Sequence, residues 1–334
     1  MISAALGLFF LLLFSELASA NFKRLAPVLE AWNRSKHPLT SALGSWEKLA
    51  VLFWAVGTSI PLLAFTLACN LFLIDPNRIG DLILGSAIGS NVLGLSLAFG
   101  LILLNGPITF FRIRTISSPV FLLLATVAFT FTCLNQTVTR IEGAILLLLA
   151  VAYGFYFRRF SSEWTYYERK QANHSLFESA DGLLPVLAIF CMGIGFFVLA
   201  VLVSYPFLNW VKQFLNSGII TDAKFAIHII APCLSLPWLL RSMYSVKESS
   251  TGKALTLTSI SHACLLNVLL LPGIMALFNP LTLSTRIISM DLPVLFFFTG
   301  VFVCSLLVEK EKGGKLTILL IASYFLYTGL GLIL

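Results

Sequence analysis

The sequence has few charged residues. Only 11% of its 334 residues are Asp, Glu, Lys or Arg, and 58% are hydrophobic, whereas a soluble domain carries about 25% charged residues. A chain of this composition cannot cover itself with a polar surface, so the lipid bilayer has to be its solvent. The composition therefore predicts an integral membrane protein. It argues against a nucleic-acid partner, despite a formal net charge of +7.

Motifs that would mark an enzyme are also missing. The sequence has no HExxH zinc motif, no Walker loop and no GxSxG nucleophile motif, so we expect neither enzymatic activity nor a cofactor. The six cysteines lie in apolar stretches without a CxxC pair and are expected to stay unpaired. No Lys or Arg precedes the first apolar run. We therefore expect a retained first helix, with a signal peptide cleaved after Ala20 as the alternative.

Long apolar runs are abundant, and each is long enough to cross a bilayer as a helix. Of the 22 Lys and Arg residues, 17 lie in or beside alternate loops, which predicts that these loops are cytoplasmic and that both termini lie outside a plasma (inner) membrane. The ten expected transmembrane helices are residues 1–20, 46–71, 80–104, 115–135, 139–157, 183–208, 221–245, 254–278, 289–308 and 315–334.

An internal repeat divides the chain. Pro61 recurs as Pro237, and Ser118-Pro119-Val120 recurs as Leu292-Pro293-Val294. Each half, residues 1–157 and 183–334, has an odd number of expected helices, so the second half enters the membrane inverted relative to the first. Residues 158–182 form a cytoplasmic linker between the halves. The fold class predicted is an all-α membrane protein of two inverted five-helix repeats.

Each repeat carries a polar patch beside a proline, in residues 57–62 with 89–94 and again in residues 233–238 with 262–267. Pro61 and Pro237 each remove a backbone donor, so both are expected to kink or unwind their helices and to free carbonyl groups. The polar side chains either join helices to one another or, as a doubled cluster, form a substrate site. The candidate binding residues are Thr58, Ser59, Ser90, Asn91, Ser235 and Asn267.

These patches resemble the two inverted repeats of the sodium/calcium exchanger family, which read GTSxPE and GSNxx(N/D). The first repeat here keeps Gly57-Thr58-Ser59-Ile60-Pro61 and Gly89-Ser90-Asn91, and the resemblance covers nearly the whole chain. Leu62 and Trp238 stand where the family has its coordinating Glu residues, and Gly94 stands where it has Asn or Asp. The resemblance implies an exchanger-like fold with a cation site at mid-membrane. Without the carboxylates, standard calcium exchange is not expected.

Three functions follow from these patterns. The first is a secondary transporter that moves a small solute, a cation in first place, by alternating access. The second is a transport-inactive exchanger paralogue that acts as a membrane scaffold or partner subunit. The third is a zinc or copper transporter, because imidazole and thiolate groups suit these metals. Its candidate ligands are His228, Cys233, His262 and Cys264.

Overall fold

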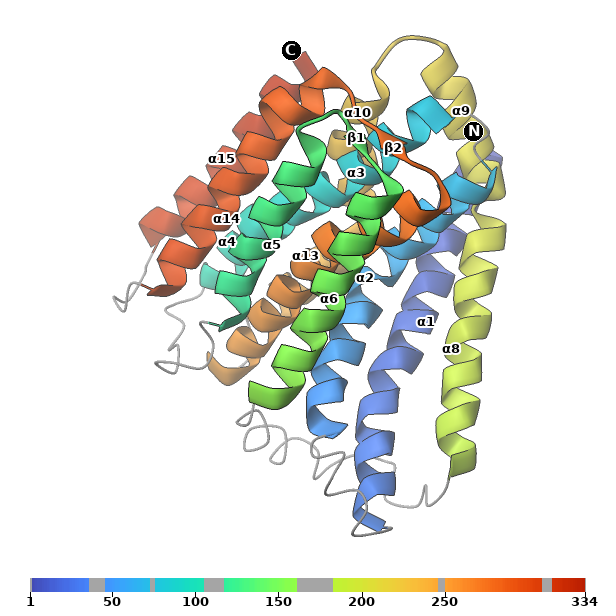
Figure 1. The fold of residues 1–334 in the computed structure, drawn as a ribbon, viewed down its shortest axis with the longest axis vertical. Coiled ribbons are helices and arrows are strands. Elements are labelled where there is room, and N and C mark those ends of the chain that lie inside the picture. Colours follow the sequence, from blue (N-terminus) through green and yellow to red (C-terminus); the bar gives the residue numbers. More distant parts are fainter. Residues whose placement is uncertain are drawn as a thin grey trace.

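The computed structural model describes residues 2–35, 46–72, 76–104, 117–160, 183–245, 250–307 and 314–333, and almost all of them are helical (Figure 1). Up to residue 160 the elements are α1 (Ile2–Ser35), α2 (Trp46–Phe72), α3 (Pro76–Leu93), the π-helix η2 (Gly94–Ala98), α4 (Phe99–Leu103), α5 (Ser117–Cys133), β1 (Thr137–Val138) and α6 (Arg140–Phe160).

From residue 183 onward the elements are α8 (Leu183–Val203), α9 (Tyr205–Asn216), α10 (Asp222–Phe225), η3 (Ala226–Ile230), α11 (Ala231–Leu234), α12 (Leu236–Ser245), α13 (Ser250–Phe278), β2 (Leu281–Thr282), η4 (Ile287–Asp291), α14 (Leu292–Leu307) and α15 (Gly314–Ile333). The predicted linker, residues 158–182, lies outside the described residues beyond the last turn of α6.

Six helical stretches in the described part are long and apolar enough to cross a membrane. They are Ile2–Phe22, Arg78–Leu103, Leu187–Asn216, Thr256–Phe278, Ile287–Leu306 and Gly314–Ile333. Two shorter apolar helical stretches, Val56–Phe72 and Pro119–Cys133, accompany them. These helices define an integral membrane protein, as the composition predicts.

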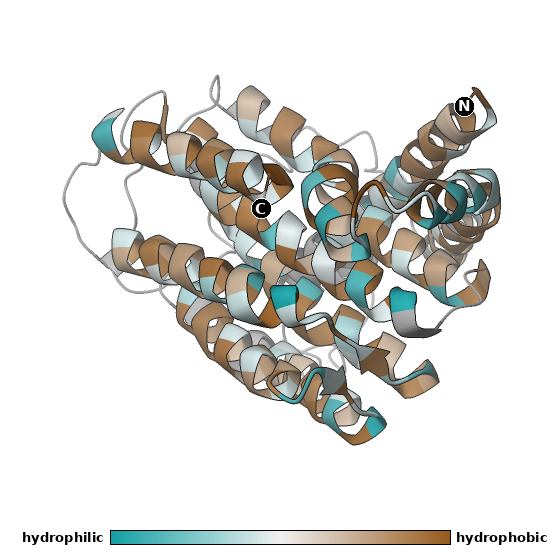
Figure 2. Ribbon diagram, turned by 90° about the horizontal axis from the view of Figure 1, so that it is seen from above, coloured by the Kyte–Doolittle hydropathy of each residue, from teal (hydrophilic) through white to brown (hydrophobic). Residues whose placement is uncertain are grey.

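The helices form a central pair surrounded by outer helices. The most apolar segment of Arg78–Leu103 is 94% buried, and that of Thr256–Phe278 is 83% buried. The corresponding segments of Leu187–Asn216 and Gly314–Ile333 are only 22% and 28% buried. Helix α13 packs against α2, α3, α5 and α6, whereas α8 packs mainly against α1. Seen from above, the outer helices are largely hydrophobic (Figure 2). The molecule therefore encloses α3 and α13 and presents apolar side chains such as Phe325 outward.

A two-residue ladder closes one end of the molecule. Thr137 in β1 pairs with Thr282 in β2, and Val138 pairs with Leu281, in antiparallel register. Figure 1 shows both strands at the same end as α10 and the C-terminus. We call this the strand end. It holds together two turns that lie more than a hundred residues apart in the chain.

The two motif prolines differ in their effect on the helix. Helix α2 continues through Pro61, so the chain does not unwind at that residue, and a kink there stays a prediction. The second motif is interrupted, and the interruption falls at Ser235 between α11 and α12, where φ is −91° and ψ is 2°. The carbonyl that Pro61 leaves without its helical donor is that of Gly57, and the neighbouring Thr58 carbonyl accepts a hydrogen bond from the Trp238 side chain.

Candidate functional site

The two motifs meet at the centre of the molecule. The Ser235 hydroxyl, at the break between α11 and α12, donates to the Ser90 hydroxyl of α3 over 2.9 Å. Both serines are buried. The helices can come this close because Gly89 has no side chain: a Cβ there would lie 2.7 Å from the Ala231 Cβ and 2.7 Å from the Ile227 carbonyl oxygen. The structure therefore brings the predicted residues of both repeats into direct contact.

A second contact joins α3 to α13 through two fully buried asparagines. Asn91 donates through Nδ2 to the Cys264 carbonyl oxygen over 2.8 Å and accepts at Oδ1 from Asn267 Nδ2 over 3.0 Å. The amide of Asn91 is thus used on both sides. Asn267 keeps a buried Oδ1 with no hydrogen-bond partner among the described residues. Asn91 therefore fixes the helix crossing, whereas Asn267 still has an acceptor to offer.

Trp238 occupies one of the two positions at which the family has a Glu. Its indole Nε1 donates to the Thr58 carbonyl oxygen of α2 over 2.8 Å, and the side chain is only 4% exposed. The indole lies directly against Gly94, where an added Cβ would be 3.0 Å from Trp238 Cζ3 and 3.2 Å from Cys264 Sγ. The large Trp238 and the small Gly94 thus complement one another across the helix crossing.

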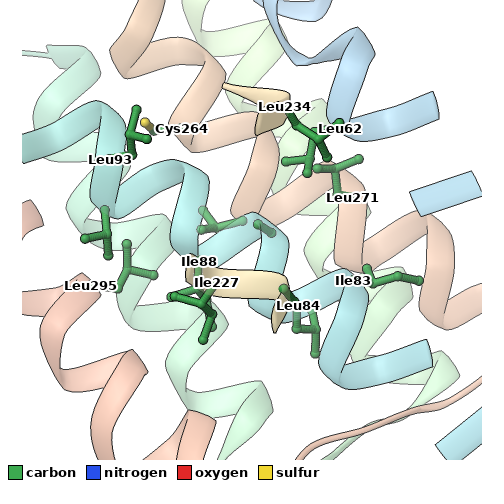
Figure 3. Packing of buried hydrophobic residues seen from close by; sticks show 14 of the residues in the cluster. Leu62, Ile83, Leu84, Ile88, Leu93, Ile227, Leu234, Cys264, Leu271 and Leu295 are labelled. Atoms are coloured by element: carbon green, nitrogen blue, oxygen red, sulfur yellow. The ribbon is translucent and has the colours of Figure 1, made fainter. Parts of the chain in front are cut away.

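Leu62 occupies the other position at which the family has a Glu, and it is 3% exposed. Figure 3 shows it beside Leu234 and Leu271, in the same buried cluster as Trp238. A carboxylate in these apolar surroundings would lose its hydration without gaining a countercharge. In the described part of the chain, Asp291 is the one buried carboxylate, and it lies on η4 rather than in either motif.

Three buried oxygens near the motifs have no hydrogen-bond partner among the described residues. They are Ser59 Oγ on α2, Ser261 Oγ on α13 and Asn267 Oδ1 on α13, and these two helices pack against each other. A buried polar atom without a partner costs about 1–3 kcal/mol, so each is a candidate to contact a bound solute. Ser261 was not among the candidate ligands, and its position beside His262 in the second motif was the available signal.

The proposed soft-metal ligands lie in different surroundings. The ring of His228 is 5.1 Å from that of Tyr327, whereas the ring of His262 is 5.8 Å from that of Tyr153. His262 Nδ1 also lies 2.7 Å from the Thr258 carbonyl oxygen of its own helix. Within the ranges that the structure describes, no group of three or more His, Cys, Asp or Glu residues is placed to hold a metal ion. The soft-metal interpretation, which includes Cys233 and Cys264, stays a prediction.

These features define a mostly helical integral membrane protein with uncharged polar contacts between the two motifs at its centre. The fold is that of a sodium-calcium exchanger. The exchanger NCX_Mj, in a structure soaked with zero Na⁺ and Ca²⁺, superposes with a TM-score of 0.60 at 18% identity, covering 98% of this chain and 99% of that one. Another structure of the same exchanger, soaked with 10 mM Na⁺ and zero Ca²⁺, gives 0.59 at 19% identity, with 98% and 97% covered.

In sequence, the chain is similar to a bacterial membrane protein. It is 26% identical over 255 residues to "Inner membrane protein YrbG" of Escherichia coli (strain K12), and the alignment covers 74% of each chain. No family model matches the sequence. The predicted resemblance to sodium/calcium exchangers is confirmed by the fold.

Proposed function

We propose that the protein is a secondary transporter that moves a small solute, a monovalent cation in first place, by alternating access. The observation that carries this proposal is the direct hydrogen bond from Ser235 to Ser90, which joins the two repeated motifs at the centre of the fold. Around this contact the Ser59 hydroxyl and the Asn267 side-chain carbonyl are buried without a partner in the described part of the chain. Hydroxyl and carbonyl dipoles alone are able to hold a monovalent cation.

The chemistry of the crossing disfavours calcium as the substrate. Calcium takes six to eight oxygen ligands that usually include carboxylates. Here the two positions corresponding to the family's Glu residues are the apolar, buried Leu62 and Trp238. A dehydrated divalent cation at this point would have no fixed negative charge beside it among the described residues, which makes its transfer from water very costly.

The architecture that we propose has ten transmembrane helices in two inverted halves, residues 1–157 and 183–334. Side-chain contacts support the symmetry. With the motifs aligned at an offset of 173, Asn91 corresponds to Cys264 and Gly94 corresponds to Asn267. A two-fold axis turns each contact between the repeats into a second contact between the corresponding residues. The contact between Asn91 and Cys264 is related to itself. The contact between Asn267 and Asn91 corresponds to the one between Gly94 and Cys264.

The membrane and orientation remain those that the sequence predicts. We propose the plasma (inner) membrane with both termini outside, supported by the uneven distribution of Lys and Arg and by the similarity to an inner membrane protein. In this orientation the strand end faces away from the cytoplasm. Homology to transporters also supports a non-enzymatic protein, without a nucleic-acid partner.

The test is solute flux in proteoliposomes under gradients of sodium, potassium, calcium, manganese or protons. We expect flux of a monovalent species that Ser90→Ala or Ser59→Ala reduces at least tenfold. The matched control is Ser86→Ala, because Ser86 is buried on the same helix as Ser90 but donates to Ile83 of its own helix. The absence of gradient-dependent flux of every ion in the wild-type protein would overturn the proposal.

A second candidate is a transport-inactive paralogue that serves as a scaffold or partner subunit. The indole of Trp238 favours it, because this side chain packs against Gly94 and bonds to the Thr58 carbonyl. This candidate predicts that Thr58→Ala, Ser59→Ala and Asn267→Ala each leave the cellular function intact. A strong phenotype from these substitutions, in protein that reaches the membrane at the wild-type level, would count against the scaffold.

A further inference from the structure

The strand end contains a buried ionic cluster that belongs to neither motif. Asp291, on η4, is fully buried, and its Oδ1 accepts a hydrogen bond from the Tyr327 hydroxyl of α15 over 2.8 Å. Arg286 Nε lies 3.9 Å from Asp291 Oδ2, and Arg286 Nη2 donates to the Gly331 carbonyl oxygen over 2.7 Å. The cluster joins η4 to α15.

Several polar atoms of this cluster lack partners among the described residues. Asp291 Oδ2 and Arg286 Nε form no hydrogen bond, and the same is true of both ring nitrogens of His228 on η3. His228 is only 7% exposed. Its ring lies 5.1 Å from that of Tyr327, and it lies so close to Gly331 that a Cβ there would be 2.2 Å from Nε2. The arrangement is buried, ionisable and incompletely bonded, which is an unusual and costly state in a membrane protein.

Other charged groups surround the cluster on each side. Asp81 of α3 is near enough for its charge to act on Asp291, and its Oδ1 accepts from the Ser284 backbone N–H over 2.7 Å. The positive charges of Arg286 and of Lys224, which lies on α10, are near enough to interact electrostatically with His228. The Arg286 side chain is 18% exposed, so the cluster borders the outside at the strand end. Figure 2, which looks onto this end, shows hydrophilic segments around the strands.

The cluster shares its elements with the central crossing. His228 lies on η3 seven residues before Ser235, and Asp81 lies on α3 nine residues before Ser90. Helix α3 packs against η3 and η4, and α15 packs against η3. A change in charge at the strand end therefore acts on α3, which carries Ser90, and on η3, which leads through α11 to Ser235. π-helical turns such as η3 and η4 are frequent at functional sites.

We propose that Asp291 and its neighbours form a proton-binding site that opens to the strand end. One proton from water binds to Oδ2, the oxygen without a hydrogen bond, and is later returned to water; no other covalent bond changes. Tyr327 keeps its hydrogen bond to Oδ1, and Arg286 keeps its charge and its bond to Gly331. The site supplies the titratable carboxylate that the motifs lack. Its role in coupling solute movement to protons rests on the proposed transport function, whereas proton binding itself does not.

The test of proton binding is infrared difference spectroscopy of the full-length protein in lipid bilayers across a series of pH values. We expect a protonated-carboxyl band that titrates in the wild type and is lost in Asp291→Asn. The matched control is Glu142→Gln, since Glu142 is a carboxylate near the strand end that accepts from the Thr139 backbone N–H. The control is expected to keep the band. Persistence of the band in Asp291→Asn would overturn the proposal.

A second variant keeps the proposal falsifiable if Asp291→Asn does not fold. Tyr327→Phe removes the hydrogen bond that Oδ1 accepts but leaves the carboxylate. Because that bond stabilises the charged form of Asp291, its loss is expected to raise proton affinity about tenfold. An unchanged titration in Tyr327→Phe would contradict the assignment to Asp291.

Flux measurements separate this proposal from the transport function. A titrating Asp291 band without flux of any ion would overturn transport and leave the proton site in place. Conversely, flux whose dependence on the pH gradient is the same in wild type and Asp291→Asn would overturn the coupling role while transport stands. Loss of that dependence in Asp291→Asn, with Glu142→Gln unchanged, is the result that we expect.

Discussion

The two motif copies correspond in sequence but differ in conformation. In the first copy, α2 continues through Pro61, and the polar groups lie along regular helix. In the second copy, the chain passes from the π-helix η3 through the short α11 to a break at Ser235. The side chains differ as well, because Leu62 is matched by Trp238 and Gly94 by Asn267. Equivalent positions therefore perform different tasks.

The difference shows how one copy compensates for the other. The broken second copy places Trp238 so that its indole bonds to the Thr58 carbonyl of the intact first copy, and Gly94 of the first copy leaves space for that indole. Asn91 of the first copy holds Asn267 and the Cys264 carbonyl of the second. The centre is stabilised by contacts between unlike partners, so the two copies are expected to respond differently to matching substitutions.

The largest expected effect concerns the pairing of Trp238 with Gly94. Trp238→Ala should destabilise the protein by about 3–5 kcal/mol, because it opens a cavity, and Gly94→Leu should cost about 1–3 kcal/mol through overpacking. The double variant should lose less than the sum, since the new leucine fills part of the vacated space. Thermal unfolding in detergent, analysed as a double-mutant cycle, measures the coupling.

The control for this cycle is Gly195→Leu on α8, because nothing lies within 4 Å of a Cβ added at that glycine. This variant should unfold at the wild-type temperature. Strictly additive losses in the Trp238 and Gly94 double variant would show that the two residues do not compensate one another.

A smaller effect should separate the two asparagines. Asn91→Ala removes two hydrogen bonds and leaves the buried Asn267 amide without its partner. Asn267→Ala removes only one hydrogen bond. We expect Asn91→Ala to lose about 1–3 kcal/mol of unfolding free energy and Asn267→Ala to lose less. Among the folded molecules, Asn267→Ala should lose more flux than Asn91→Ala, because Asn267 keeps a free acceptor for solute. Equal effects on stability and flux would remove the distinction.

The smallest effects should come from the two prolines. Pro61→Ala restores a backbone donor inside the continuous α2 and should stabilise the protein by about 1 kcal/mol. Pro237→Ala lies in the first turn of α12, where a missing N–H costs little, so we expect a change below about 0.5 kcal/mol. Chemical denaturation of both variants tests the order. A larger change at Pro237 than at Pro61 would contradict the structural difference between the copies.

The backbone was largely predictable because it follows from hydropathy. The run predicted at residues 46–71 is helix 46–72, and the motifs around Ser90 and Ser235 do meet. The break at Ser235 and the continuity of α2 were not predictable, since a proline is tolerated both inside a membrane helix and in the first turn of one, and the sequence alone does not decide between the two. The Asp291 cluster was likewise missed, because Asp291 and Tyr327 are brought together by helix packing over 36 residues of sequence.

The strand end has a mechanical consequence. The β1–β2 pairing is extended by the Leu283 backbone N–H, which donates to the Gln136 carbonyl oxygen over 2.8 Å. Pulling these turns apart would break these backbone hydrogen bonds and expose the buried side chains of Val138 and Leu281. The pairing therefore ties the turn after α5 to the turn after α13, and we expect any relative movement of these helices to be smallest at the strand end.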